Sequence, residues 1–199
     1  MENRFEYDPI THIYKINGSA IPSVTQVLQD VGIVDLSDVP PDRLEAARQF
    51  GVAVHDACEL LDNQDLDMVS LDPALFPYVD AWSRFKYDTG FFMLDNEKAI
   101  FSLRHRVAGR PDRVGMMDVL TVVDIKSTAS MNPATAVQSG GYKIIYNENR
   151  IPAEQIKKRI GVLLKPDGKY KIEPYNDEGD LNVFLSALNV TNWKRRYAK

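Results

Sequence analysis

The chain has 199 residues, 44% of them hydrophobic, and a formal net charge of −4, which together indicate a single globular domain over residues 1–199. Composition alone points to neither a nucleic acid, a membrane nor an acidic partner, so any polyanion has to be bound by a local basic patch. The one cysteine, Cys58, excludes a disulfide framework and any iron–sulfur or zinc site made of cysteines alone, and it indicates a reducing compartment.

The first half of the chain is expected to hold one hairpin and three helices. The pair Asn17–Gly18 marks a turn, and Ser23 and Gln26 then have the spacing of a capping box at a helix start. Apolar residues recur at helical spacing in two later segments, which a polar linker with prolines separates from the first helix. The expected elements are a strand over 12–16, a helix over 22–32, a linker over 35–42, and helices over 42–63 and 74–90.

Three extended segments rich in β-branched and aromatic residues follow and are joined by short turns, which predicts an antiparallel meander. A helical segment comes next, then a hairpin around the turn Pro166-Asp167-Gly168, and then a last helix. This order predicts an α/β fold whose mixed central sheet is made of the meander and the hairpin and is flanked by helices. The segments are 91–103, 105–117 and 120–128 (extended), 132–149 (helix), 158–175 (hairpin) and 180–199 (helix).

Two acids and a lysine interrupt the apolar pattern of the second and third extended segments. Asp124 and Lys126 stand two residues apart at the end of a Val-rich strand, so their side chains point to the same face. For this pair alone a salt bridge at the sheet edge is the simpler interpretation, because buried charges need a partner. Asp112, in a turn position after a proline, precedes Asp124 by a strand end, a turn and a return strand, so the two acids can face each other. Close carboxylates repel one another, and a divalent cation stabilises them.

His55 stands four residues after Gly51 within the helix expected over 42–63. A glycine inside a helix costs ~1 kcal/mol relative to alanine, and at this spacing it leaves a gap beside the imidazole through which a substrate backbone can approach. A single helical histidine is more often a packed or surface residue, so the functional interpretation of His55 depends on its neighbours in space.

Gln138 and Tyr142 are also four residues apart, with two glycines between them, on the helix that follows the Asp124–Lys126 strand. Their amide and hydroxyl groups can reach a phosphate or an attacking water from one helix face. Alone, the pair is more simply a polar patch on a helix surface.

Taken in chain order, these motifs match a known pattern. They are His55, Pro111-Asp112, Asp124-Ile125-Lys126 and Gln138-x-x-x-Tyr142. The acid–lysine part resembles the signature of the PD-(D/E)XK nuclease superfamily, and the histidine and the Gln–Tyr pair resemble its RecB-like branch. Residues 14–28 also resemble the N-termini of small phage-encoded exonucleases of that branch. The resemblance implies a restriction-endonuclease-like core.

The resemblance further implies a site for divalent metal ions and a role for each residue. The metal ligands would be His55, Asp112, Asp124 and the backbone carbonyl of Ile125. Lys126 would orient or deprotonate water, and Gln138 and Tyr142 would position the nucleophile or the scissile strand. The implied cofactor is Mg²⁺ or Mn²⁺, with two ions per site, and the histidine nitrogen favours tolerance of Mn²⁺.

Two departures from the family limit what the resemblance implies. Several relatives carry four cysteines for an iron–sulfur cluster, which a chain with Cys58 alone cannot form, so no such cluster is expected. The chain also has no P-loop, so a helicase activity is not expected. Glu97, in the first extended segment, is another acid that could face the site, but strand register is too poorly defined by sequence to give it a role.

Arginines near Asp112 are the expected contacts to DNA, because phosphate binding depends on a local basic patch. A solvated strand edge is the alternative interpretation of this cluster. A second and a third basic cluster lie at 157–159 and 194–196, and favourable charge at a helix C-terminus is the simpler explanation of the third. The expected substrate-binding residues are Arg106, Arg110, Arg113 and Ser127.

The sequence therefore predicts a metal-dependent DNA nuclease, foremost an exonuclease that processes phage or mobile-element DNA. A structure-specific endonuclease and a catalytically idle DNA-binding module with the same fold are the alternatives. The expected partners are DNA and, beyond it, a recombinase or a single-strand-binding protein. No segment approaches the ~18 uninterrupted apolar residues of a membrane span, so a cytoplasmic protein of a bacterium or a phage-infected cell is expected.

Overall fold

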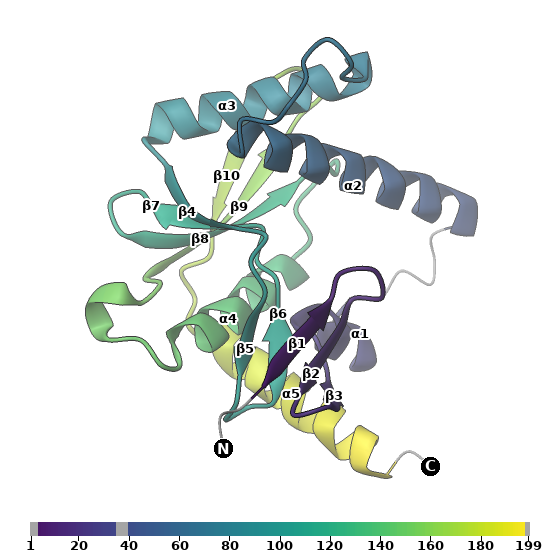
Figure 1. The fold of residues 1–199 in the computed structure, drawn as a ribbon, viewed down its shortest axis with the longest axis vertical. Helices are drawn as coiled ribbons and strands as arrows, with labels where there is room; N and C mark the ends of the chain where they lie inside the picture. The colour runs from purple at the N-terminus through teal and green to yellow at the C-terminus, as the bar shows by residue number, and fades with distance from the viewer. Residues whose placement is uncertain (1–3, 35–39, 198–199) are drawn as a thin grey trace.

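A five-stranded mixed β-sheet forms the centre of the protein (Figure 1). The computed structural model describes residues 4–34 and 40–197. The strands of the central sheet are β4 (Phe92–Asn96), β7 (Arg113–Met116), β8 (Leu120–Lys126), β9 (Lys158–Leu164) and β10 (Tyr170–Pro174). They lie in the order β10-β9-β8-β7-β4.

The pairing of these strands agrees with the predicted meander and hairpin. β4, β7 and β8 are antiparallel neighbours, and β9 and β10 form the antiparallel hairpin. β8 and β9 are parallel, with Asp124 opposite Gly161. Parallel neighbours need a crossover connection, which the helix α4 (Ala134–Asn147) supplies. The predicted α/β fold class with a mixed central sheet is therefore confirmed.

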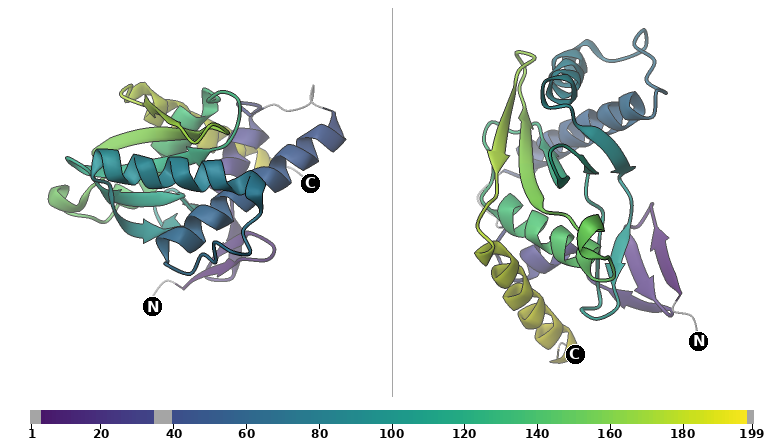
Figure 2. Two further views of the ribbon diagram at one scale, coloured as in Figure 1. Left: turned by 90° about the horizontal axis from the view of Figure 1, so that it is seen from above. Right: turned by 90° about the vertical axis from the view of Figure 1, so that its left-hand side faces the viewer.

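Helices cover both faces of the central sheet (Figure 2). The long helices α2 and α3 pack on one face around the buried rings of Trp82 and Phe85, and α1, α4 and α5 pack on the other face around Phe184. No helix among the described residues is both long and apolar enough to cross a membrane. The helices are α1 (Val24–Asp30), α2 (Pro41–Asp62), α3 (Phe76–Thr89), α4 and α5 (Gly179–Tyr197), with short 3₁₀ turns at Pro73–Leu75 and Pro152–Glu154.

Alternation along β8 decides which side chains face which helical layer. Val123 and Ile125 belong to the core under α2 and α3, whereas Val122 belongs to the core under α1, α4 and α5. Because side chains two positions apart share a face of a strand, Asp124 and Lys126 lie on the side of Val122. The end of β8 thus carries an acid and a lysine toward α4.

Two smaller sheets lie beside the central one and hold the N-terminal segment in place. The rings of Phe5 and Tyr7 stack on Tyr14, and Phe5 also stacks on Phe101. The strand that carries Phe5 and Tyr7 was not predicted from the sequence. The first sheet contains β1 (Phe5–Asp8), β2 (Ile13–Ile16) and β3 (Ser19–Ile21), and the second contains β5 (Ile100–Ser102) and β6 (Val107–Gly109).

Two of the predicted extended segments are each divided between two sheets. Residues 91–103 break at Glu97, whose φ of 47° turns the chain from β4 into β5. Residues 105–117 break between β6 and β7, where Pro111 has no N–H to continue a ladder. The two breaks lie side by side, because the N–H of Glu97 donates to the carbonyl of Asp112 at 3.0 Å. The breaks between the central sheet and the β5–β6 sheet therefore lie at Glu97 and Asp112, two acids that are neighbours in space.

The predicted helix boundaries agree with the structure within one or two residues. Ser23 and Gln26 form the capping box of α1, and α3 ends at Gly90 with a φ of 64°. Most of the linker predicted over 35–42 falls on residues 35–39, and the end of the last predicted helix falls on residues 198–199. These two segments lie outside the described residues.

Candidate metal centre and its cavity

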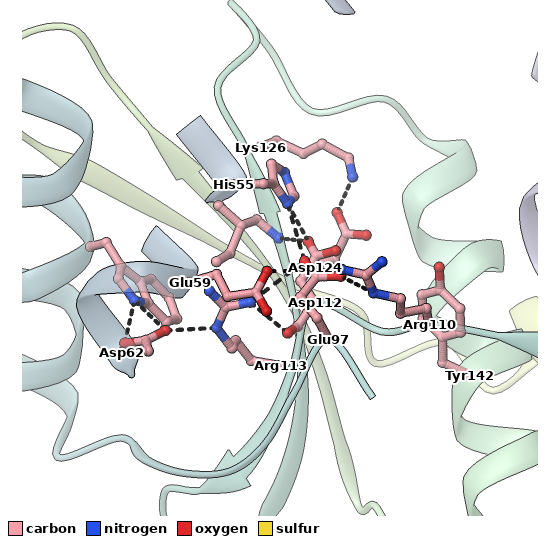
Figure 3. A network of polar contacts seen from close by, with 12 residues as sticks. His55, Glu59, Asp62, Glu97, Arg110, Asp112, Arg113, Asp124, Lys126 and Tyr142 are labelled. Carbon is pink, nitrogen blue, oxygen red and sulfur yellow. Dashed lines mark hydrogen bonds and ion pairs between the residues drawn. The ribbon is translucent and has the colours of Figure 1, made fainter. Parts of the chain in front are cut away.

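Three residues from separate elements bring metal-ligating atoms together (Figure 3). His55 lies on α2, Glu97 follows β4, and Asp112 precedes β7. The Nδ1 atom of His55 is 3.7 Å from Oδ2 of Asp112 and 3.8 Å from Oε1 of Glu97. One ligand atom from each residue lies within 4.8 Å of the others. An imidazole and two carboxylates at this spacing fit a divalent cation.

Glu97 is the member of this group to which sequence reasoning gave no role. Its backbone extends the pairing of β4 and β7 by one step, and its positive φ then turns the carboxylate toward His55. A non-glycine residue in the left-handed region is uncommon, and such strain is frequent at functional sites. A shift of register between Met93 and Asp95 lies just before it. Because this irregularity cannot be seen in the sequence, the face on which Glu97 emerges could not be predicted.

Asp112 also ties the meander together. Its Oδ2 accepts a hydrogen bond of 2.6 Å from the N–H of Ile125 on β8. The N–H and C=O of one residue in an extended strand point to the same side, so the carbonyl of Ile125 also faces the segment of Asp112. The predicted role of that carbonyl as a metal ligand is compatible with this direction and stays a prediction.

The acid and the lysine at the end of β8 form a close ion pair. Nζ of Lys126 is 2.5 Å from Oδ2 of Asp124, whose side chain is 1% exposed. Burial raises the pKa of Asp124 to about 6, and the ammonium group of Lys126 opposes this rise. Asp124 is not one of the three residues whose ligand atoms converge within 4.8 Å. The structure therefore brings His55 and Asp112 together as predicted and places Asp124 beside them, held by Lys126.

The pKa of His55 reflects the acids around it. Burial in this site lowers the pKa, but the carboxylates of Asp112 and Glu97 outweigh burial, so the pKa lies above the ordinary value. An imidazole between two carboxylates has a high local density of negative charge beside it. The two carboxylates therefore favour positive charge on or beside His55, and Arg110 and Arg113 already supply part of it through their ion pairs with Glu97.

Gln138 and Tyr142 meet as the spacing on one helix predicts. The side-chain amide of Gln138 donates to the hydroxyl of Tyr142 at 3.0 Å. The Tyr142 ring lies against Gly109, where an added Cβ atom would come within 2.7 Å of the ring. Burial and then the charges of Asp112 and Asp124 raise the pKa of Tyr142, so its hydroxyl stays protonated as a donor. A glycine on β6 is thus needed to seat this tyrosine.

The converging residues line a cavity of about 630 Å³, which is in the range of small-molecule sites. Its walls come from β2, the start of α1, the middle of α2, the end of β6 and the helix α4. The residues that line it include Tyr14, Ser23, Gln26, Gly51, His55, Glu97, Arg110, Asp112, Gln138 and Tyr142.

The structure separates the four residues predicted to contact substrate. Arg110 lines the cavity, but its Nε is 2.7 Å from Oε2 of Glu97 and its Nη1 donates to the hydroxyl of Tyr7 at 3.1 Å. Ser127 is partly buried, and its Oγ is the nearest atom to the open side of Gly51. Arg106 lies on a different cavity, described below.

The prediction that Arg113 contacts substrate conflicts with its place in the structure. Its side chain is 0% exposed, and its Nε forms an ion pair of 2.7 Å with Oδ2 of Asp62. Its Nη1 donates to the backbone carbonyl of Asp112 at 2.7 Å. Arg113 therefore supports the segment of Asp112 from inside the core, because alternation on β7 directs it toward α2 and Trp82.

Comparison with known proteins agrees with this fold. No family model matches the chain, and no curated protein matches it. A solved structure from Eubacterium rectale, named "Putative exonuclease", aligns with a TM-score of 0.51 and 8% identity over 72% of this chain. The chain spans about 65% of the length of that protein. This likeness shows that the two proteins share a fold.

Two solved structures of an alkaline exonuclease from Laribacter hongkongensis, LHK-Exo, also align with the chain. They cover 88% and 89% of it at 14% and 15% identity, and one of them is a complex with dAMP. Their TM-scores are 0.41 and 0.33.

Proposed function

We propose that this protein is a metal-dependent DNA nuclease of the PD-(D/E)XK type, with residues 1–199 forming one nuclease domain. The observation that carries the proposal is the convergence of His55, Glu97 and Asp112 within 4.8 Å, next to the strand end that carries Asp124 and Lys126. The shared fold of a protein named as an exonuclease supports the same reaction class.

The donor set fits a hard divalent cation with tolerance for a nitrogen ligand. His55, Glu97 and Asp112 would hold the ion, and Asp124 with the carbonyl of Ile125 would complete its ligands. Mg²⁺ and Mn²⁺ both accept carboxylate oxygens, and the imidazole favours Mn²⁺. When bound, such an ion supplies Lewis acidity at phosphoryl oxygens and a lower pKa for an attacking water.

The side chains around the metal ligands would position the substrate. Lys126 presents an ammonium group, 27% exposed, where charge develops on a phosphate during hydrolysis. Gln138 and Tyr142 act as a joined pair of donors from α4, fixed by the hydrogen bond between them. Arg110 would contact substrate from the cavity wall when its ion pair with Glu97 opens.

The finer assignment is an exonuclease that processes phage or mobile-element DNA in the cytoplasm, with a recombinase or single-strand-binding protein as a further partner. This assignment depends on the motif resemblance. A structure-specific endonuclease with the same centre is the second candidate, because one catalytic core serves both activities and loops decide access to DNA ends.

Cleavage of labelled DNA tests the proposal directly. Purified protein is incubated with end-labelled single-stranded, end-labelled double-stranded and closed circular DNA, each in Mg²⁺, Mn²⁺ or EDTA. We expect metal-dependent loss of label from linear DNA, no cleavage in EDTA, and survival of the circle. A cut circle would instead assign an endonuclease. Binding without cleavage of any substrate would leave a DNA-binding module and contradict the nuclease proposal.

Metal binding should also be visible without DNA. Mn²⁺ added at 100 times its Kd stabilises the folded state by about 2.7 kcal/mol, which corresponds to a rise in Tm of roughly 5–10 °C. The reason is that the cation relieves repulsion between Glu97 and Asp112 while binding His55. Differential scanning calorimetry measures the shift. The variant Glu97→Gln should lose most of it, and an equal shift in that variant would exclude Glu97 as a ligand.

Replacing Gly51 by alanine should stabilise the fold and impair cleavage. A Cβ at this position meets only Oγ of Ser127, at 3.9 Å, so helix propensity should raise the free energy of unfolding by about 0.5–1 kcal/mol. The added methyl narrows the cavity that Gly51 lines, so kcat/KM should fall several-fold.

The matched control for Gly51→Ala is Asn189→Ala, at an exposed position of α5 away from the cavity. It should give a similar gain in stability with unchanged cleavage. Thermal unfolding and steady-state cleavage of linear DNA measure both quantities. Unimpaired activity in Gly51→Ala would show that substrate does not approach the helix at this point.

A further inference from the structure

A second cavity, of about 380 Å³, lies between the β5–β6 turn and the C-terminal part of α5, at the lower end of the molecule in Figure 1. One wall is formed by residues 20–22, at the end of β3. The polar residues that line it are Arg104, His105, Arg106, Asn192, Arg195 and Arg196. No acidic residue lines this cavity within the part of the chain that the structure describes.

The turn that supplies half of these residues is held rigidly. The N–H of His105 donates to Oγ of Ser102 at 2.8 Å, and the N–H of Arg104 donates to Oε1 of Glu148 at 3.1 Å. The hydroxyl of Ser102, which is fully buried, also contacts the carboxylate of Glu148. Arg106 has a φ of 51°, a conformation in which glycine or asparagine is usual. The hydrogen bonds of the turn therefore fix the backbone from which the side chains of Arg104 and Arg106 project.

The guanidinium groups are almost free of acidic partners. Of the four arginines that line this cavity, Arg195 forms an ion pair, at 3.8 Å from Asp30. Arg104, Arg106 and Arg196 form no ion pair with any residue in 4–34 or 40–197. Charge at the C-terminus of α5 does not account for the two arginines on the β5–β6 turn. A planar guanidinium pairs with two oxygens of a phosphate, so a group of them without acids fits a phosphate-bearing ligand.

The second cavity adjoins the metal centre through a shared wall. Residues 20–22 line the second cavity, and residues 23–26, which follow directly, line the first. The carbonyl of Pro22 accepts a hydrogen bond of 3.0 Å from Ala108, which fixes this wall to β6. β6 itself joins the two sites, because it runs from the turn of Arg106 to Arg110.

The length of β6 sets the distance between the two sites. From Arg106 to Arg110 the chain advances by four residues, of which β6 is three, and four residues of extended chain span at most about 13 Å. Successive nucleotides of one strand advance ~3.4 Å along the axis of a duplex and further in an extended single strand, so this span corresponds to at most about four nucleotides. β6 itself is buried, so a strand whose phosphate lies at the metal centre would reach the second cavity along residues 20–26, which line the two cavities in turn.

We propose that the second cavity binds the phosphodiester backbone of the DNA substrate, within about four nucleotides of the bond that is cleaved. The proposal rests on the proposed nuclease function for the identity of the ligand. It assigns the arginines at 104, 106, 195 and 196 to substrate length and affinity. They touch none of the residues of the metal centre.

Binding and cleavage by Arg104→Ala/Arg106→Ala test the proposal. Fluorescence anisotropy with a labelled 12-nucleotide strand in EDTA measures affinity at several salt concentrations. We expect a loss of affinity of about tenfold or more, and a fall of between one and two in the slope of log K against log salt. With a ladder of substrates in metal, KM of the native protein should drop once the DNA exceeds about four nucleotides. The variant should lose this drop and keep its kcat.

The control Lys165→Ala/Lys169→Ala also removes two positive charges, but from the β9–β10 turn. This turn lies at the opposite end of the molecule in the right-hand view of Figure 2. A loss of affinity equal to that of the arginine variant would overturn the proposal, and so would native protein that does not bind DNA. Polyglutamate that competes as well as DNA would also overturn it, because the cavity would then bind any polyanion. Arginine-dependent binding without any cleavage would contradict only the nuclease function. Unchanged thermal unfolding of both variants verifies that they fold.

Discussion

Asp112→Asn should abolish metal-dependent DNA cleavage, with kcat/KM falling by about 10³-fold or more, equivalent to about 4 kcal/mol of lost transition-state stabilisation. Asparagine keeps the shape of the side chain and an oxygen for the N–H of Ile125, which now donates to Asp112 at 2.6 Å. It removes the charge that faces His55 at 3.7 Å. The change therefore weakens the metal site while leaving the meander intact. Steady-state kinetics on labelled linear DNA, with Mn²⁺ varied, measures the loss.

Asp118→Asn is the matched control for this variant. The substitution is again aspartate to asparagine, and Asp118 lies on the same hairpin, in the turn between β7 and β8. There its Oδ1 is 3.2 Å from Nζ of Lys158. Its side chain is 68% exposed, so cleavage and stability should both stay near those of the native protein. More than a tenth of native activity in Asp112→Asn would exclude Asp112 as a required ligand. A Tm as high as or higher than that of the native protein would show that the lost activity is not caused by unfolding.

The parts of the fold that local rules control were predictable from the sequence. The capping box of α1 and the hairpin of β9 and β10 depend on residues a few positions apart. The shared face of Asp124 and Lys126 follows from the period of a strand, and the hydrogen bond between Gln138 and Tyr142 follows from the period of a helix. Each of these features needs only the neighbours along the chain.

The features that depend on distant packing were not predictable in the same way. Glu97 enters the site because a register shift and a positive φ turn it there, and neither leaves a mark in the sequence. Arg113 is adjacent to Asp112 in sequence, which suggested a phosphate contact, but its partner Asp62 lies on another element. Arg106 and Arg196 line one cavity although they are far apart along the chain. In each case the decisive contact joins segments whose relative placement only the folded core defines.

Asp62→Ala should be the most destabilising single change near the site, lowering the free energy of unfolding by about 3–5 kcal/mol. The Asp62 side chain is 1% exposed and accepts a hydrogen bond of 3.0 Å from Nε1 of Trp82. It also pairs with Lys86 at 2.5 Å and with Arg113 at 2.7 Å. Removing it leaves the buried guanidinium of Arg113 with only its longer ion pair to Glu97, at 3.6 Å, and a buried charge that loses its main partner is strongly unfavourable. Urea denaturation followed by tryptophan fluorescence measures the loss.

Asp80→Ala is the control, because it removes an acid from an exposed pair with Arg84 and should cost less than about 1 kcal/mol. The double variant Asp62→Leu/Arg113→Met removes both charges and should recover much of the stability that Asp62→Ala loses. Cleavage should stay low in the double variant, because it lacks the guanidinium of Arg113. In the native protein this group donates to the carbonyl of Asp112 at 2.7 Å. DNA affinity in EDTA should be unchanged, because Arg113 is closed to solvent. A double variant that remains as unstable as Asp62→Ala would contradict the buried ion pair as the cause, and one that loses DNA affinity would restore Arg113 as a substrate contact.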